Sequence, residues 1–589
     1  MPDQYIYNYG DSVKVLPAWA DELANKYQSK TTNLYILHGN IRDFLPHERK
    51  EGEFSFKRVQ DYISEILFGN EKIIAYFDCS RGITFCLPHM EQNYLKAASG
   101  FAVNTDVDKS DFLSNDPVKS FPYLEKYFLS QISEDKRIKG RKVLIIDFAE
   151  HIVPAGELTR LSDTNTFCVV TFSRWATDPI FSYGDISIIL LTENLSDISS
   201  RLTGSPWTVK INVPFPDAKI RESYLRSRES AGKLLLEPGL TSERLALITS
   251  GLNLMNLNLL ASESYENEKP ISLELMRQKK KEIIENGACG LLEFMETSYD
   301  LSHVSGHEFV KKRFKNAAKA IKKGRPDVLP MGYLIAGPVG TGKSFMVSAF
   351  AGEIGIPMVK FRNFRTKWQG ETESNLERVL NILIAMSPVG VMIDEADAFL
   401  GDRENQGDSG TSNRVFAQIA SFMGNTEYRG KIIWFLITCR PDLVPIDLKR
   451  QGRVEEHLAL FYPETKADRE ALFNTLVRKL DLDIRNFSIS DLFRKYDYEY
   501  SGADLEAVLK RAQHIAAMAD RVFVKREDME EAMSDFIPSA NTHEVELQNL
   551  VAVLECTSKE MIPSRFQKLS RNKIISEIQV LKAALLGGH

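Results

Sequence analysis

The segment at 332–355, GYLIAGPVGTGKSFMVSAFAGEIG, constrains the fold of this chain more than any other. A short apolar run precedes GPVGTGKS at 337–344, and an apolar, helix-like run follows it. The pattern GxxxxGK[ST] between a strand and a helix is typical of a phosphate-binding loop, because its glycines let backbone N–H groups turn inward toward phosphates. The N-terminus of the following helix adds its positive dipole end. The segment therefore predicts an α/β fold with a phosphate site at the carboxyl end of this strand.

The side chains in this loop predict a nucleotide with a metal ion. Lys343 is placed to reach the β- and γ-phosphates of ATP, and the Ser344 hydroxyl is placed to ligate Mg²⁺. A chance glycine-rich turn is the alternative, but the strand–loop–helix context and a second, correctly spaced motif argue against it. The predicted binding residues for ATP and Mg²⁺ are Gly337, Pro338, Val339, Gly340, Thr341, Gly342, Lys343, Ser344 and Phe345.

The second motif is a buried strand that ends on two carboxylates. VGVMIDEADAFL at 389–400 has an apolar run followed by Asp394 and Glu395. Asp394 is predicted to hold Mg²⁺ together with Ser344, and Glu395 to activate the attacking water. The pair of motifs predicts ATP hydrolysis.

Strand-like and helix-like segments alternate around these motifs. MVKF at 358–361 and KIIWFLITC at 431–439 are typical of buried strands. Between them, a stripe at spacing i, i+3, i+4, i+7, i+8 predicts an amphipathic helix; its members are Leu376, Val379, Leu380, Leu383 and Ile384. The alternation predicts a parallel sheet covered by helices, with the site at the carboxyl ends of the strands.

A similar strand end occurs in the N-terminal half without a phosphate loop. VLIIDFAEH at 143–151 ends on Asp147 and Glu150, but no GxxxxGK[ST] precedes Val143. Metal and water chemistry is one interpretation of these carboxylates. A polar strand end without chemistry is the other, and we favour it because the missing loop supplies most phosphate contacts.

Other N-terminal segments follow the order of the C-terminal half. Strand-like runs occur at 33–40, 72–85 and 186–202, the last with Asn194 near its end, and VPFPDAKIRESYLRSR at 213–228 compares with FYPETKADREALF at 461–473. These parallels predict a second, diverged module that lacks the phosphate loop.

The chain from about 305 to 540 resembles an AAA+ ATPase module. The motifs that carry the resemblance occur in the family's order: GPVGTGKS, KWQGETESNLERVL, VGVMIDEAD, WFLITCRPD, DLKRQGRVEE and YSGADLEAVLKRA. The resemblance implies an α/β fold class with two AAA+-type αβα sandwich modules, each followed by a small helical lid, and a helical C-terminal tail.

The domain limits that follow from this resemblance are given in chain order. A degenerate AAA-like large domain without Walker A is expected at 1–212, a lid-like segment and linker at 213–290, the ATPase core at 291–464, a helical lid at 465–540, and the tail at 541–589. The tail has two helix-like segments and is expected either to pack on the lid or to mediate ring contacts.

The resemblance also assigns roles to residues outside the two motifs. Arg450 and Arg453 would act on the nucleotide of a neighbouring subunit, which implies a homo-oligomeric, hexameric ring. Thr438 and Cys439 fall at sensor 1, where the family usually has Asn, and a thiol is a weaker hydrogen-bond partner than an amide. Trp368, Gln369 and Gly370 fall in the loop that faces the central pore of the ring.

Composition excludes several other classes of protein. The formal net charge of −6 gives no general attraction to nucleic acid. The lysine-rich segment at 309–327 lacks interleaved stacking aromatics, so a solvated helix face is favoured over a nucleic-acid patch. The six cysteines form no CxxC pair, and no apolar run has the length of a membrane span. With no secretory pattern at the start of the chain, we expect a cytoplasmic location.

Three functions remain after these exclusions. The favoured one is a ring ATPase that remodels, unfolds or disassembles a protein substrate or complex. The alternative is an ATP-dependent assembly factor or regulatory scaffold for a large protein assembly, which the diverged first module and Cys439 support. A nucleic-acid motor or clamp loader is disfavoured by the net acidity and by the absence of a zinc module.

Overall fold

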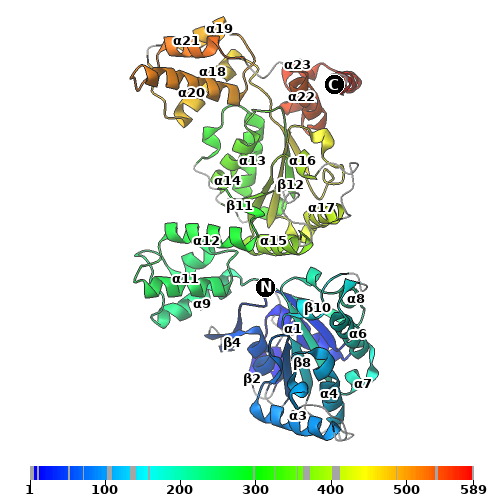
Figure 1. Cartoon of the computed structure of the whole chain (residues 1–589). Helices are drawn as coiled ribbons and strands as arrows, with labels where there is room; N and C mark the ends of the chain where they lie inside the picture. The colour runs from blue at the N-terminus through cyan, green and yellow to red at the C-terminus, as the bar shows by residue number, and fades with distance from the viewer. Residues whose placement is uncertain are drawn as a thin grey trace. The chain divides into compact units, whose positions relative to one another are not determined.

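The computed structural model of the chain divides it into two compact units (Figure 1). Unit 1 comprises residues 1–287 and 373–385, and unit 2 comprises residues 288–372 and 386–589. The structure describes residues 6–9, 12–50, 53–69, 72–102, 109–132, 141–156, 160–295, 299–323, 325–354, 356–362, 372–400, 411–485, 487–537 and 542–586.

Unit 1 is built on a 6-stranded sheet with the order β10-β3-β9-β8-β6-β7. All neighbouring strands are parallel except β7, which pairs antiparallel with β6. The strands are β3 (Leu34–Gly39), β6 (Ile73–Asp78), β7 (Gly82–Phe85), β8 (Lys142–Ile146), β9 (Ile186–Thr192) and β10 (Thr208–Val213).

Helices cover both faces of this sheet. Successive side chains of a strand point to opposite faces, so neighbouring residues pack in different cores. Ile36 and Leu144 pack in one core with α3, α4 and α6, whereas Tyr35 and Val143 pack in a second core with α1 and a π-helix. The covering elements are α1 (Ala18–Ser29), the π-helix (Tyr62–Phe68), α3 (Pro88–Phe101), α4 (Pro117–Ser130), α5 (Ala149–Ile152), α6 (Asp163–Thr177), α7 (Pro179–Tyr183) and α8 (Ser200–Thr203).

A β-hairpin follows β3 where a phosphate-loop fold would continue into a helix. The hairpin consists of β4 (Phe44–Lys50) and β5 (Glu53–Arg58), and a short helix, α2 (Val59–Asp61), leads from it into the π-helix. A further antiparallel pair, β1 (Ile6–Tyr9) and β2 (Ser12–Val15), precedes α1.

A helical domain completes the N-terminal unit. It contains α9 (Ala218–Ser230), α10 (Ser242–Ile248), α11 (Leu254–Glu266) and α12 (Leu273–Gly287). Phe56 of the hairpin contacts the Tyr224 ring of α9 edge-on at a centroid distance of 5.0 Å. The hairpin therefore joins the sheet to the helical domain within unit 1.

Unit 2 repeats the same sheet order in its own residues, β11-β13-β14-β15-β12-β16. Only β11 is antiparallel to its neighbour, so β12, β13, β14, β15 and β16 correspond in position to β3, β6, β8, β9 and β10. The strands are β11 (Leu292–Phe294), β12 (Gly332–Ala336), β13 (Met358–Phe361), β14 (Val389–Ile393), β15 (Ile432–Thr438) and β16 (Glu456–Ala459).

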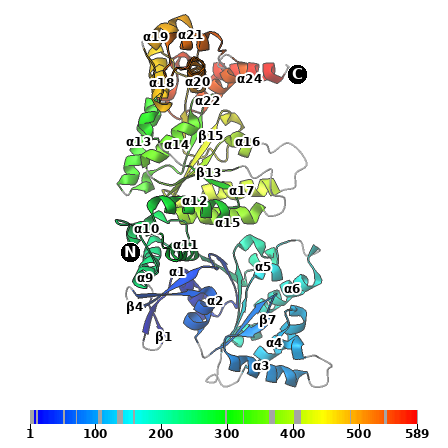
Figure 2. The ribbon, with the colours of Figure 1, turned by 60° about the vertical axis from the view of Figure 1, so that its left-hand side comes forward.

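Helices lie on both sides of this second sheet, α13 and α14 on one and α16 and α17 on the other (Figures 1 and 2). Phe314 of α13 and Phe350 of α14 stack at a centroid distance of 4.3 Å within the first of these layers. The helices are α13 (Glu308–Lys322), α14 (Lys343–Ile354), α16 (Ala396–Leu400) and α17 (Thr411–Met423).

The apolar stripe predicted at 376–384 forms helix α15 (Thr372–Met386). Leu376, Val379, Leu380 and Leu383 are buried and Ile384 is half-buried. Residues 373–385 of this helix group with unit 1, where the Glu377 carboxylate accepts hydrogen bonds from the N–H groups of Leu195 and Ser196.

Four helices and a separate tail follow the second sheet. The four helices share one apolar core and are α18 (Lys466–Lys479), α19 (Ile489–Lys495), α20 (Gly502–Met518) and α21 (Arg526–Ser534). The tail contains α22 (His543–Glu555), α23 (Ser564–Gln567) and α24 (Arg571–Leu586). Its apolar side chains form a core with Ala336, Ala459 and Phe461, so the tail covers the β12–β16 end of the sheet.

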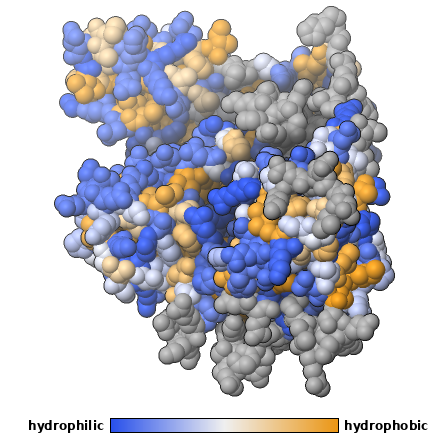
Figure 3. All heavy atoms as spheres, turned by 60° about the horizontal axis from the view of Figure 1, so that its bottom comes forward, coloured by the Kyte–Doolittle hydropathy of each residue, from blue (hydrophilic) through white to orange (hydrophobic). Residues whose placement is uncertain are grey.

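The predicted fold class is confirmed: two α/β units with helices on both sheet faces are each followed by helices, and a helical tail ends the chain. Hydrophilic residues mixed with separate hydrophobic spots cover the face shown in Figure 3. Among the described residues, no helix combines the length and the apolar character that crossing a membrane requires.

Candidate nucleotide site

The loop after β12 has the backbone geometry that its glycines were expected to provide. Gly337, Gly340 and Gly342 have φ of 140°, 80° and 81°, a region that side-chain-bearing residues rarely adopt. A Cβ on Gly337 would lie 2.0 Å from the Leu460 carbonyl oxygen, and one on Gly340 would lie 2.6 Å from the Ser501 hydroxyl. The loop therefore forms only with glycine at these positions.

The Lys343 ammonium is buried at the start of α14 and is bonded to the loop itself. Its Nζ donates to the carbonyl oxygens of Gly337 and Pro338, both at 2.8 Å, and lies 3.2 Å from the Cys439 sulfur. These neutral partners hold the lysine at the mouth of the loop without neutralising its charge. Phosphate oxygens, which are charged acceptors, fit this ammonium better than the carbonyl groups do.

Ser344 and Asp394 meet at the ends of β12 and β14, as predicted. The Ser344 hydroxyl donates to Asp394 Oδ2 at 3.3 Å, and Lys360 of β13 forms an ion pair with the same oxygen at 3.0 Å. A hydroxyl and a carboxylate are the hard oxygen ligands that Mg²⁺ prefers, so this pair fits the metal. Lys360 was not identified from the sequence, although a lysine in an apolar strand beside β14 was a usable signal.

Glu395 follows Asp394 in a strained conformation. Its φ is 51°, its N–H donates to Asp394 Oδ1 at 3.1 Å, and its side chain is exposed. A left-handed residue other than glycine or asparagine is uncommon and often marks a functional site. The turn separates the two carboxylates: Asp394 is bonded beside the loop, whereas the Glu395 side chain is exposed.

The two predicted sensor residues have different surroundings. The Thr438 hydroxyl donates to Asp397 Oδ1 at 2.6 Å and accepts from the Arg440 N–H at 2.8 Å, so it joins β15 to α16. Cys439 is the residue whose side chain approaches Lys343. The Thr438 hydroxyl therefore bonds within the fold, and the Cys439 thiol is the sensor group that lies beside the phosphate loop.

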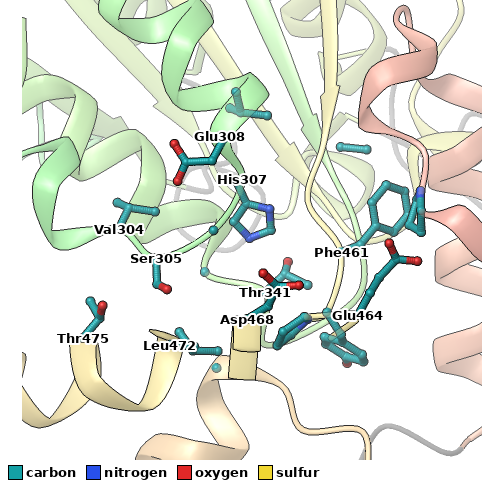
Figure 4. A pocket seen from close by; sticks show the side chains of 18 of the residues that line it. Val304, Ser305, His307, Glu308, Thr341, Phe461, Glu464, Asp468, Leu472 and Thr475 are labelled. Atoms are coloured by element: carbon teal, nitrogen blue, oxygen red, sulfur yellow. The ribbon is translucent and has the colours of Figure 1, made fainter. Parts of the chain in front are cut away.

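A cavity of about 650 Å³ lies beside the loop and extends under the helical domain of unit 2 (Figure 4). His307 and Thr341 face it from one side, with Phe461 and Glu464 across the space and Leu472 of α18 on a third side. Desolvation lowers the pKa of His307 below its usual value, so its imidazole is neutral near pH 7. An apolar space beside a phosphate loop is suited to the base and sugar of a nucleotide.

The predicted arginines lie outside this cavity. Arg450 is exposed and pairs with Asp447 at 2.7 Å, and Arg453 donates to the Asp447 carbonyl oxygen at 2.6 Å. Among the described residues, neither forms a hydrogen bond or ion pair with the phosphate loop of its own chain. The predicted pore residues Trp368, Gln369 and Gly370 lie outside the described residues.

In unit 1, protein side chains engage the aspartate that corresponds to Asp394. The Asp147 carboxylate at the end of β8 accepts hydrogen bonds from Arg42 at 2.6 Å and from Gln60 at 2.8 Å. Arg42 comes from the short segment after β3, where unit 2 has its phosphate loop. Each aspartate is thus paired with a basic side chain, Asp147 with Arg42 and Asp394 with Lys360, but only Asp394 also meets the hydroxyl of a phosphate-loop serine.

The residue that corresponds to Glu395 in unit 1 is Phe148. Both residues have a φ of 51°, and both donate their N–H to the preceding aspartate. The Arg42 guanidinium lies 3.9 Å from the centre of the Phe148 ring. Glu150 comes two residues later, at the start of α5, and one of its carboxylate oxygens is buried without a hydrogen-bond partner among the described residues. The geometry thus supports the interpretation of this strand end as free of chemistry.

Asp43 then links the sheet of unit 1 to its helical domain. Its buried carboxylate accepts from the N–H groups of Leu254 and Met255, at 3.0 and 2.8 Å, at the N-terminus of α11. An anionic group in this position is stabilised by the helix dipole. In unit 1 a side chain therefore connects the sheet to the N-terminus of a helix in the helical domain.

The fold and the glycine loop are those of the P-loop class of proteins, with the loop present in unit 2 and replaced by other residues in unit 1. Three family models match in tandem. Residues 9–214 match an AAA+ chaperone N-terminal Rossmann-like domain, residues 219–289 an AAA+ chaperone second helical domain, and residues 333–462 the ATPase family associated with various cellular activities (AAA). The chain belongs to the AAA+ superfamily as a tandem AAA protein.

Curated relatives agree with this placement at low identity. An uncharacterized AAA domain-containing protein ycf46 of Guillardia theta is 27% identical over 365 residues, which are 60% of this chain and 70% of that protein. A cell division cycle protein 48 homolog of Archaeoglobus fulgidus is 24% identical over 488 residues, 73% of this chain and 65% of the relative. The peroxisomal ATPase PEX6 of Kluyveromyces lactis is 27% identical over 252 residues, 36% of this chain and 25% of the relative. These matches support ATPase activity in general terms.

We predict that Glu395→Gln retains ATP binding but lowers turnover by about 10²–10⁴-fold, the usual contribution of a general base. Lys343→Ala should instead weaken binding, because it removes the buried ammonium. Glu150→Gln is the matched control in unit 1 and should leave both quantities unchanged. Equilibrium binding and steady-state ATPase assays measure the two effects, and parental turnover by the Glu395 variant would contradict the assignment.

We also predict one tight ATP site per chain. In unit 1 Arg42 is bonded to Asp147, which corresponds to Asp394, and Phe148 takes the place of Glu395. Titration calorimetry with Mg²⁺-ATP measures the stoichiometry. Asp147→Asn should keep it at one site per chain, whereas Asp394→Asn should remove the dependence of binding on Mg²⁺. Two tight sites in the parental protein would refute the altered status of unit 1.

Proposed function

We propose that this protein is an ATP-hydrolysing AAA+ ring ATPase that remodels, unfolds or disassembles a protein substrate or complex. The observation that carries the proposal is the 3.3 Å contact between Ser344 and Asp394, beside a glycine loop with the buried Lys343. Residues 50 positions apart thereby bring together the hydroxyl, carboxylate and ammonium that ATP and Mg²⁺ require.

Each residue of the proposed site in unit 2 would have a separate role in ATP hydrolysis. Lys343 would exchange its carbonyl partners for phosphate oxygens, while the loop N–H groups orient the phosphate chain. Ser344 and Asp394 would hold Mg²⁺, which supplies positive charge to the phosphate oxygens as negative charge develops on them. A carboxylate oxygen of Glu395 would accept a proton from the attacking water. Lys360 balances the charge of Asp394 when the metal is absent.

The ring and the arginine roles are part of the same proposal. Arg450 and Arg453 are bonded within their own loop and, among the described residues, make no contact with the phosphate loop of their chain. This arrangement supports a role on a neighbouring subunit in a hexameric ring. A cytoplasmic location fits the six cysteines, which form no disulfide bond.

An assembly factor or regulatory scaffold is the second candidate. The specific observation in its favour is the altered site of unit 1, where Arg42 and Asp43 bond within the protein. Such a unit would not change shape with nucleotide and would serve as a fixed platform for a partner protein. The two candidates differ in whether a substrate passes through the ring.

We predict that catalysis is shared between subunits. Arg453→Ala and Lys343→Ala proteins should each be inactive alone but regain partial ATPase activity when mixed, because some interfaces then combine an intact arginine with an intact loop. An arginine acting in trans contributes on the order of 10³–10⁵ in rate in related phosphoryl-transfer systems. ATPase assays of mixed rings measure the recovery, with a variant of an exposed lysine, Lys431→Ala, mixed in as control. Absence of recovery in rings that exchange subunits would contradict shared sites.

Trp368→Ala separates the two candidate functions. If Trp368 grips substrate in the pore, the variant should keep assembly and ATP turnover but lose substrate processing, since an indole binds extended chain through its apolar area. Trp207→Ala, which truncates a half-exposed tryptophan in unit 1, is the matched control. If the protein is a scaffold, the variant should keep ring assembly, ATP turnover and its activity on the partner protein. Joint loss of ring formation and ATPase activity would instead assign Trp368 to subunit packing and contradict the pore role.

A further inference from the structure

We infer that helix α22 of the C-terminal tail is part of the nucleotide site and that Gln548 is a positioning residue for the phosphate loop. The inference rests on the proposed function, namely that unit 2 binds ATP. It assigns a task to a segment that follows the matched AAA domain at 333–462 in the sequence.

Both backbone polar groups of Val339 are held from outside the loop. Its N–H donates to Gln548 Oε1 at 3.0 Å, and its carbonyl oxygen accepts from the Tyr462 hydroxyl at 2.7 Å. These two bonds fix the rotation of the peptide units that precede Gly340. The loop N–H groups that follow are therefore presented in one orientation before phosphate arrives, which lowers the cost of ordering on binding.

Gln548 cannot easily move away from this position. Its side chain is buried, and its neighbours on α22, Leu547 and Val551, belong to the apolar core that contains Ala336 at the end of β12. A buried amide costs free energy unless it is hydrogen-bonded. A residue needed only for packing would be apolar here, so the polar side chain indicates that the bond to the loop is its role.

Ion pairs attach the same tail to the other loops around the site. Glu555 bonds with Lys449 at 2.9 Å and with His457 at 3.0 Å, and Lys582 bonds with Asp442 at 2.7 Å. Burial opposes ionisation of Glu555 and Asp442, yet these partners hold the pKa of each carboxyl below its usual range. Lys449 directly precedes Arg450, and Asp442 follows Cys439 by three residues. The tail thus contacts the segments on which the sensor and the arginines lie.

The tail also forms part of the wall of the 650 Å³ cavity. Met561, Ile562, Pro563 and Gln567 line it together with Gly340 and Phe345. A nucleotide in this cavity would lie against tail residues as well as against the loop. Contacts to the loop, to its flanking segments and to the cavity wall therefore agree in placing the tail within the site.

The test is Gln548→Met, which keeps the length and approximate volume of the side chain but removes the amide acceptor. We expect the Kd for ATP to rise about tenfold, the effect of losing one hydrogen bond in a buried site. kcat should change by less than about twofold, because Glu395 and Asp394 are untouched. Amide exchange of residues 337–345 in the nucleotide-free protein should become faster, which a packing role alone would not produce.

Two further variants make the result decisive. Tyr462→Phe removes only the hydroxyl that bonds the Val339 carbonyl, so it tests the same peptide without a packing change, and its effect should be non-additive with that of Gln548→Met. Val580→Ala alters an exposed side chain of α24 and should leave the Kd unchanged. Lower thermal stability with unchanged Kd and loop exchange in both loop-contact variants would overturn the inference. Absence of ATP binding by the parental protein would instead refute the proposed function.

Discussion

A carboxylate follows the corresponding strand in both units, Asp394 after β14 and Asp147 after β8, and the groups that compensate its charge differ between the units. A carboxylate in this position needs a cation or hydrogen-bond donors, because uncompensated charge at a partly buried strand end is costly. Unit 2 meets the need with Ser344 of the glycine loop and with Lys360 of β13. Unit 1 meets it with Arg42 and Gln60, neither of which comes from a phosphate loop.

The two units have the same sheet order, but only unit 2 has a phosphate loop. Their strand orders correspond, and Phe148 and Glu395 even share the same left-handed turn. The difference arises after the first parallel strand, where unit 2 has a glycine loop and helix α14 while unit 1 has Arg42, Asp43 and a β-hairpin. The sheet requires the apolar strand of unit 1 for its core, so the strand and its terminal aspartate persist where the phosphate loop is absent.

The tail restricts the glycine loop of unit 2 by contacts from outside the loop. Glycines make the loop possible, but they also leave it conformationally free in the absence of phosphate. The bonds of Gln548 and Tyr462 to Val339 restrict that freedom from outside, and the ion pairs of Glu555 and Lys582 tie the tail to neighbouring loops. The loop of the proposed nucleotide site is thereby connected to a segment that lies outside the matched AAA domain at 333–462.

The sequence alone determined features that depend on local spacing: the glycine loop, the carboxylates after β14, the apolar stripe of α15 and the missing loop before Val143. Strand and helix periodicities are local properties, so the parallel α/β sheet followed from them. The two-module architecture with its lids was implied by the resemblance to AAA+ ATPases. Only the tertiary structure decided that Phe148 takes the place of Glu395, that Lys360 reaches Asp394, and that Arg42 meets Asp147 across 105 residues. The bond between Val339 and Gln548 spans 209 residues. Such contacts arise where separate strands and helices are brought together by packing of the sheet, and no spacing along the chain encodes them.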